Sequence, residues 1–139
     1  MERIERLVRM HPPDVRQHFA VVVAADGRKV LAWGASRLAR EGHDHAEANA
    51  IRELASRGYN ARELRNLTLV VGRKFNNEFK QSKPCVECCL AIRRAGVFRN
   101  VSWSTSSGFE EVRVRDLTCE YISIGRGRTL RARQAASCR

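Results

Sequence analysis

The sequence predicts an α/β fold, a three-layer α-β-α sandwich around a mixed five-stranded sheet. Short apolar runs of strand length alternate with segments in which apolar residues recur at helical spacing. The first two apolar runs are separated by a hairpin-turn signal. The last two are separated only by Ser106-Ser107-Gly108-Phe109, whereas a parallel crossover needs a dozen or more residues. We therefore expect the final two strands to be antiparallel.

The N-terminal half is predicted to form a helix, a β-hairpin and a second helix. The first ten residues carry one apolar side and are followed by a pair of prolines that stops the helix. Strands at 19–25 and 28–34 flank Asp26-Gly27, which favours a tight turn. A loop at 35–42 leads to a helix over 45–57, which a glycine ends.

The C-terminal half is predicted to add a strand, a helix and two further strands. The apolar run 67–72 is a buried strand, and a polar loop separates it from a helix at 85–95. Pro84 can open this helix and a glycine can close it. Strands are expected at 97–105 and 110–115. The chain thus reads as one domain over 1–120 and an arginine-rich tail, partly ordered at best, over 121–139.

Composition and charge limit the class of protein. No apolar run approaches the ~18 residues that cross a bilayer, and the N-terminus lacks the apolar centre of a signal peptide. We therefore expect an intracellular protein of the cytoplasm or nucleus, without a membrane partner and with reduced thiols. Lys+Arg number 26 against 15 Asp+Glu, a net charge of +11. Such an excess indicates either a solvated basic surface or a partner that carries phosphate.

Three of the five cysteines gather in the stretch SKPCVECCLAI. Cys85 and Cys88 lie three residues apart on the first turn of a predicted helix, so their sulfurs share one face. The positive end of the helix favours thiolates, and two thiolates at this spacing make half of a zinc site. A thioredoxin-like redox pair is the alternative. Cys89, four residues after Cys85, could replace Cys88 as a ligand.

The start of the other central helix, Asp44-His45-Ala46-Glu47, offers the rest of a metal site. His45 is a natural third ligand, and three protein ligands with an open position are typical of catalytic zinc. Glu47 does not share the helix face of His45, so it would lie beside the metal and could carry a proton. Alternatively, Asp44 and Glu47 could form a capping box.

Together, H-x-E followed by P-C-x-x-C is the signature of zinc deaminases. Residues 19–116 resemble the cytidine/deoxycytidylate deaminase superfamily through four segments: HAEANAI at 45–51, LTLVV at 67–71, KPCVECCLAIRRAGV at 83–97 and VSWST at 101–105. The resemblance implies a cytidine-deaminase-like sandwich in which His45, Cys85 and Cys88 hold one Zn²⁺ and Glu47 is the general acid/base. It also implies that zinc-activated hydroxide displaces the amine of the base as ammonia. The family pattern favours Cys88 over Cys89 as the ligand.

Substrate contacts follow in part from the same resemblance. The backbone around Ala46 and Pro84 would lie near the base, and Ser36 occupies the place where many relatives carry a sugar-binding asparagine. The remaining candidates are a basic residue for a phosphate and aromatic residues on which bases could stack. They are Arg37, Trp33, Phe75, Phe79 and Trp103.

The expected function is conversion of cytosine to uracil, and the basic charge favours single-stranded DNA or RNA as substrate. The alternative is a free pyrimidine nucleotide or nucleoside (CMP, dCMP or cytidine). Two further alternatives are deamination of adenine in RNA and a catalytically inactive, zinc-stabilised nucleic-acid-binding domain. Glu47 argues against the inactive domain, since a dead site needs no proton carrier. Members of the family that this chain resembles are often dimers to hexamers, so a homo-oligomer is also possible for this protein.

Overall fold

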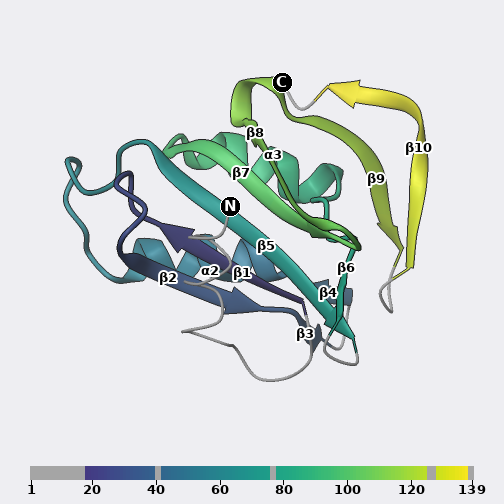
Figure 1. The fold of residues 1–139 in the computed structure, drawn as a ribbon, viewed down its shortest axis with the longest axis horizontal. Coiled ribbons are helices and arrows are strands. Elements are labelled where there is room, and N and C mark those ends of the chain that lie inside the picture. Colours follow the sequence, from purple (N-terminus) through teal and green to yellow (C-terminus); the bar gives the residue numbers. More distant parts are fainter. Residues whose placement is uncertain (1–17, 40–41, 76–77, 125–127, 138–139) are drawn as a thin grey trace.

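The computed structural model describes residues 18–39, 42–75, 78–124 and 128–137 (Figure 1). Its centre is a six-stranded sheet in the order β2-β1-β5-β7-β8, with the short β6 paired to β5. Among neighbouring strands, β5 and β7 are parallel and the other pairs are antiparallel, including β7 and β8. The strands are β1 His18–Val23, β2 Val30–Ala35, β5 Leu67–Phe75, β6 Glu78–Lys80, β7 Phe98–Thr105 and β8 Gly108–Arg113. The mixed sheet and its antiparallel last pair are confirmed, and β6 is an addition.

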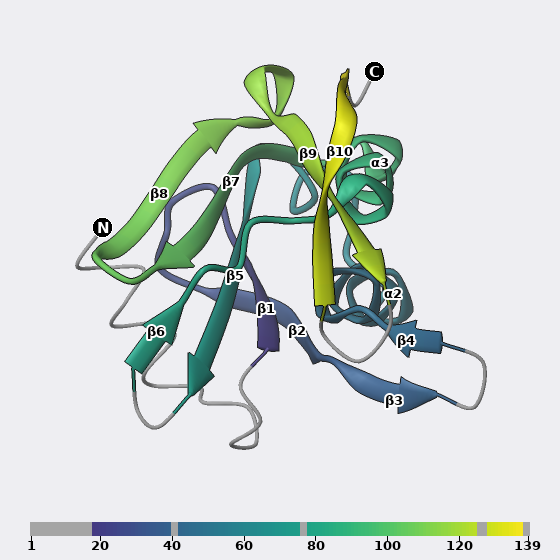
Figure 2. The same cartoon turned by 90° about the vertical axis from the view of Figure 1, so that its right-hand side faces the viewer.

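The strand directions bring the beginnings of both described helices to one edge of the sheet. β2 and β5 are each antiparallel to β1, so their carboxyl ends lie at the same edge. Helix α2 (Ala46–Ser56) follows β2 through the small hairpin of β3 (Arg37–Ala39) and β4 (Gly42–Asp44). Helix α3 (Val86–Ala95) follows β5 through β6. Turned by 90°, the molecule shows α2 and α3 on the same side of the sheet (Figure 2).

Both faces of the central strands are buried, and the side chains alternate between them. In β1, Ala20 and Val22 join the core beneath the helices, whereas Phe19, Val21 and Val23 pack with Val70 on the opposite face. A strand buried on both sides reads as a continuous apolar run, as FAVVVAA does. The helix expected at residues 1–10 lies outside the described residues.

Gly34 lets β2 approach α2 more closely than any side chain would allow. A Cβ placed there would lie 2.5 Å from the backbone nitrogen of Ala50 and 2.8 Å from the Cβ of Asn49. The amide of Asn49 also donates a 2.7 Å hydrogen bond to the carbonyl oxygen of Ala35. These contacts fix the first turn of α2, which carries Glu47, against the edge of the sheet.

Gly34→Ala is therefore expected to lower the free energy of unfolding by about 1–3 kcal/mol, because the clash is with backbone that no rotamer change can relieve. Urea unfolding followed by circular dichroism measures the loss. Gly58→Ala is the control: it has φ +68° but open space around its Cβ, so it isolates the conformational cost alone. Equal stability of Gly34→Ala and the unchanged chain would contradict the close approach.

Two segments differ from the sequence-based expectations. The segment 35–42, expected to be a loop, contributes backbone to the β3–β4 hairpin. The arginine-rich C-terminal segment forms a two-stranded antiparallel sheet of β9 (Thr118–Ile124) and β10 (Arg128–Ser137), with β9 beside α3. The expected boundary at residue 120 thus falls within β9. No helix in the described part of the chain is long and apolar enough to cross a membrane.

Candidate metal centre

His45, Cys85 and Cys88 come together where α2 and α3 begin. The Nδ1 atom of His45 lies 3.2 Å from the Cys88 sulfur and 3.6 Å from the Cys85 sulfur. The three ligand atoms all lie within 4.8 Å of one another. A tetrahedral zinc with bonds of about 2.0–2.3 Å separates its ligand atoms by roughly 3.3–3.8 Å. The group is therefore positioned to bind one zinc ion.

The helix ends explain why these side chains are available. His45 is the N-cap residue of α2 and Cys85 is the N-cap residue of α3, yet neither side chain makes a capping hydrogen bond. N-cap side chains usually bind the first free backbone N–H groups of their helix. Here they point to each other across 3.6 Å instead, and two helix N-termini place positive potential beside the thiols. The local structure favours thiolate ligands.

Hydrogen bonds among His45, Cys85 and Cys88 shift the pKa of each of the three side chains. Hydrogen bonds from the Cys88 thiol and from His45 lower the pKa of Cys85 to about 4. The same contact with Cys85, together with burial and the nearby charge of Glu47, raises the pKa of Cys88. The hydrogen bond to Cys85 raises the pKa of His45. One thiolate and one thiol therefore share the site, and a bound divalent metal would displace the second proton.

Two buried serines anchor the segment that leads into Cys85. The Ser82 hydroxyl donates to the carbonyl oxygen of Val71 (2.9 Å) and contacts the Ser104 hydroxyl (2.8 Å). The Ser104 hydroxyl donates to the carbonyl oxygen of Lys80 (2.7 Å), and the backbone N–H of Ser104 donates to Ser82 (2.9 Å). These bonds tie the chain before α3 to β5 and β7. They therefore fix the position of Cys85 relative to the sheet.

Glu47 is a buried carboxylate beside the metal group. It is 1% exposed and close enough to Cys88 to be one of the causes that raise the pKa of that thiol, after Cys85 and burial. It does not form the capping box considered above, because the N-cap residue is His45 rather than Asp44. Its Oε1 atom has no hydrogen-bond partner among the described residues. Leaving a buried polar atom without a hydrogen-bond partner costs free energy. The Oε1 atom of Glu47 is therefore available to hydrogen-bond to a molecule bound at the site.

His18 is a residue that the sequence analysis missed. Its Nε2 atom lies 3.8 Å from the Glu47 Oε1 atom and is likewise buried without a hydrogen-bond partner in the described structure. His18 begins β1 and alternates with Phe19, so it shares the helix side of the sheet with Ala20. The period of two along this strand was the available signal. A single histidine at the start of a strand forms no motif, so the sequence did not identify His18 as a site residue.

Cys89 belongs to the core rather than to the metal group. It is fully buried in the cluster beneath the helices, and its sulfur lies 3.7 Å from the carbonyl oxygen of Pro84. Burial raises its pKa to about 12, so it remains a thiol. The group of three potential ligand side chains found in the described part of the chain does not include it.

The other predicted contact residues separate into those near the metal group and those away from it. Ala46 and Pro84 are buried and adjoin His45 and Cys85 in sequence. The backbone N–H of Ser36 donates to the carbonyl oxygen of His18 (3.0 Å). Trp103 in β7 is 3% exposed within the helix-side core, and the Lys83 ammonium lies 5.4 Å from its ring centre.

The aromatic residues proposed for stacking do not gather at the metal group. Phe79 lies on the opposite face of the sheet, where its ring meets that of Phe109 edge to face with centres 5.1 Å apart. Trp33 packs against the same opposite cluster. Arg37 lies in β3 and Phe75 ends β5, and their side chains lie outside the described part. A continuous row of stacking side chains is thus not formed by Phe79 and Trp33.

Comparisons with known proteins agree with this geometry. The sequence model of the cytidine and deoxycytidylate deaminase zinc-binding region matches residues 1–105 of the 139. The crystal structure of cytidine deaminase from Burkholderia pseudomallei is similar, with a TM-score of 0.55 and 18% identity over 81% of this chain and 89% of that chain. This likeness shows the fold, and no curated protein sequence matches the chain. The matched region contains His45, Cys85 and Cys88, which are positioned to bind zinc. The chain therefore belongs to the cytidine and deoxycytidylate deaminase zinc-binding family.

Proposed function

We propose that this protein is a zinc-dependent hydrolytic deaminase that converts cytosine to uracil. His45, Cys85 and Cys88 are the metal ligands, and Glu47 is the general acid/base. The observation that carries the proposal is a buried carboxylate, whose Oε1 atom has no hydrogen-bond partner in the described structure, beside a group of three potential ligands. Zinc bound at such a site lowers the pKa of a water molecule toward neutrality and makes it a nucleophile.

Glu47 has the position and surroundings for moving the protons of this reaction. Hydrolytic deamination takes a proton from water and delivers protons to the base and to the departing amine, which leaves as ammonia. A carboxylate that is 1% exposed, with an Oε1 atom that has no hydrogen-bond partner in the described structure, can accept and return a proton without competing solvent. A redox reaction of Cys85 and Cys88 would give neither His45 nor Glu47 a role. The hydrolytic reaction uses all four residues.

Single-stranded DNA or RNA is the substrate class we propose. The net charge of +11 is suited to a chain of phosphates, and the reaction requires a base that is not paired in a duplex. A free nucleotide or nucleoside is the second candidate, because a solved structure with a similar fold is named a cytidine deaminase. The two candidates use the same chemistry and differ in what the protein contacts beyond the base.

A side-by-side deamination assay tests the proposed function. Zinc-loaded protein is given cytidine, CMP, dCMP and single-stranded oligonucleotides that contain cytosine or adenine, and uracil or hypoxanthine formation is measured. We expect uracil from the cytosine oligonucleotides, with a rate at limiting substrate that falls steeply as salt rises. Conversion of the mononucleotides alone, at a rate indifferent to salt, would select the second candidate. No conversion of any substrate would overturn the deaminase assignment.

His18 is expected to position the Glu47 carboxylate. Replacing it by alanine removes the neighbour 3.8 Å from Oε1 and lets the carboxylate rotate or hydrate. We expect His18→Ala to lower kcat by about 10–100-fold while zinc content is unchanged, because a misplaced carboxylate loses part of the roughly 10²–10⁴-fold that general acid–base catalysis contributes. His18→Gln keeps a donor and should recover part of the activity. Full activity of His18→Ala, or loss of zinc from it, would contradict the positioning role.

A further inference from the structure

An arginine-lined pocket lies away from the metal centre. It has a volume of about 420 Å³ and is lined by Arg93, Phe98, Arg99, Arg113, Val114 and Arg115. These residues come from the last turn of α3, from β7 and from the end of β8 with the turn that follows it. The metal centre is at the first turn of α3, and a helix of ten residues is about 15 Å long. The two sites are therefore at opposite ends of one helix.

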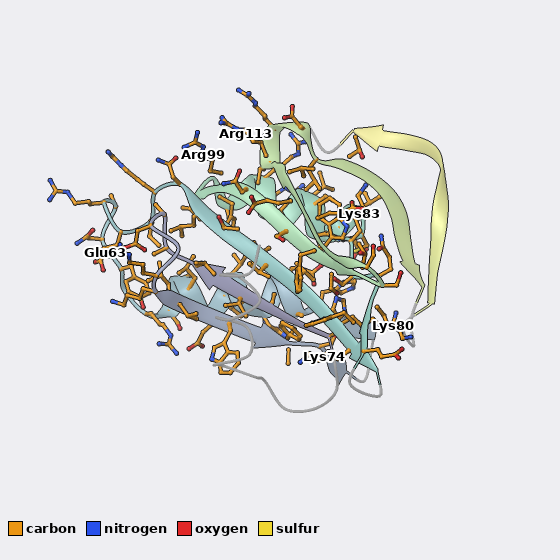
Figure 3. The ribbon with its side chains drawn as sticks, viewed as in Figure 1. Glu63, Lys74, Lys80, Lys83, Arg99 and Arg113 are labelled. Atoms are coloured by element: carbon orange, nitrogen blue, oxygen red, sulfur yellow. The ribbon has the colours of Figure 1, made fainter. Side chains whose placement is uncertain are left out.

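The charges of this pocket are not balanced by the residues that line it. Four arginines and no carboxylate make up its charged side chains. In the described structure no carboxylate forms an ion pair with Arg99 or Arg113, and both extend from the same upper edge of the molecule (Figure 3). Arg115 is 3.8 Å from Asp116, but both are largely exposed, so this pair contributes little. Four like charges around one hollow disfavour each other unless an anion binds.

Fold stability accounts for one of these arginines but not for the others. Arg93 donates a 2.8 Å hydrogen bond to the carbonyl oxygen of Leu117 and lies where a cation stabilises the end of a helix. Even so, its Nε atom is buried without a partner in the described part. Arg99 in β7 and Arg113 in β8 both line the pocket, and Arg113 pairs in the sheet with Asn100, the residue after Arg99. No contact within the described chain explains that placement.

We propose that this pocket binds the phosphate backbone of a single-stranded nucleic acid whose target base reaches the metal centre. The inference rests on the proposed deaminase function and assigns the surface that holds the backbone of its substrate. Guanidinium groups bind phosphate oxygens in a two-pronged geometry. Phe98 is 9% exposed, so it offers little surface on which a base could stack, and the pocket is suited to phosphate. A ligand that fills both sites must be longer than a mononucleotide, because the sites are separated by the length of α3.

The test compares two charge-matched double variants. Arg99→Gln/Arg113→Gln removes two charges from the pocket, and Arg62→Gln/Arg65→Gln removes two from the exposed loop that carries Glu63 (Figure 3), whose residues do not line the pocket. Binding of a fluorescent single-stranded oligonucleotide is measured by anisotropy across a salt series. We expect the pocket variant to bind on the order of tenfold more weakly, with its log–log salt slope reduced by about 1.4, or 0.7 per lost contact. The loop variant should change little.

The controls distinguish a polynucleotide from a free phosphate as the ligand of the pocket. They also separate the failure of the pocket proposal from the failure of the deaminase proposal. Inorganic phosphate and dCMP are added as competitors, and turnover of free cytidine or dCMP is measured for all three proteins. We expect neither competitor to displace the oligonucleotide at concentrations where a second oligonucleotide does. Equal weakening by both double variants, or displacement by inorganic phosphate or dCMP, would overturn the pocket as a polynucleotide site. A third outcome is that only the pocket variant binds the oligonucleotide more weakly, while the unchanged protein deaminates no substrate. This outcome would support the pocket as a nucleic-acid site and overturn the proposed deaminase function.

Discussion

Glu47→Gln is expected to lower kcat by about 10²–10⁴-fold while leaving zinc content and fold unchanged. The amide has the size of the carboxylate but cannot accept a proton from water and return it to the leaving amine. The substitution keeps the volume of a side chain that is 1% exposed. Zinc per chain, measured by atomic emission, and kcat on the substrate that the deamination assay identifies decide the outcome.

Glu53→Gln is the matched control for this variant. Glu53 lies on the same helix, but its side chain is 42% exposed and its carboxylate pairs with Arg57 at 2.9 Å. An exposed pair of this kind contributes little to stability, so activity and zinc content should both be unchanged. If Glu47→Gln lost its zinc, Glu47 would be a ligand. If it kept full activity, the proton carrier would be another group.

The sequence could predict the central sheet because local and long-range signals agree there. The run 19–25 is apolar on both faces, Asp26-Gly27 is a turn, and the short 106–109 connection requires an antiparallel pair. The metal group was also accessible from sequence, since Cys85 and Cys88 have a helical spacing and His45 begins the other helix. What brings the two helices together is the common direction of β2 and β5, which follows from the topology.

Features that depend on contacts between distant segments were not predictable in this way. His18 meets Glu47 only because β1 lies beneath α2, and 29 residues separate the two in the chain. Ser82 and Ser104 bond across 22 residues, and neither has a sequence pattern of its own. The β9–β10 hairpin includes the arginine-rich strand β10, whose composition resembles that of a tail. Backbone pairing in an antiparallel hairpin does not require such segments to be apolar.

The two adjacent cysteines at the start of α3 should respond oppositely to the same substitution. Cys88 presents its sulfur to His45 at 3.2 Å, whereas Cys89 is fully buried among core side chains with its sulfur 3.7 Å from the carbonyl oxygen of Pro84. We expect Cys88→Ser to reduce zinc affinity by at least about 100-fold, because even the outer partners of metal ligands are worth 10–100-fold. Cys89→Ser should retain one zinc per chain.

We expect Cys89→Ser to lower the free energy of unfolding rather than the zinc affinity. Serine would place a hydroxyl in the apolar cluster beneath the helices, which costs about 1–3 kcal/mol unless a hydrogen bond replaces the lost solvation. Zinc content after dialysis against a chelator, and urea unfolding of the zinc-loaded proteins, separate the two effects. The reverse pattern, with zinc lost from Cys89→Ser and kept by Cys88→Ser, would move the ligand by one residue and rotate α3. Residues 88 and 89 lie on different faces of α3. Comparing the two variants therefore determines which face of the helix is turned toward the metal.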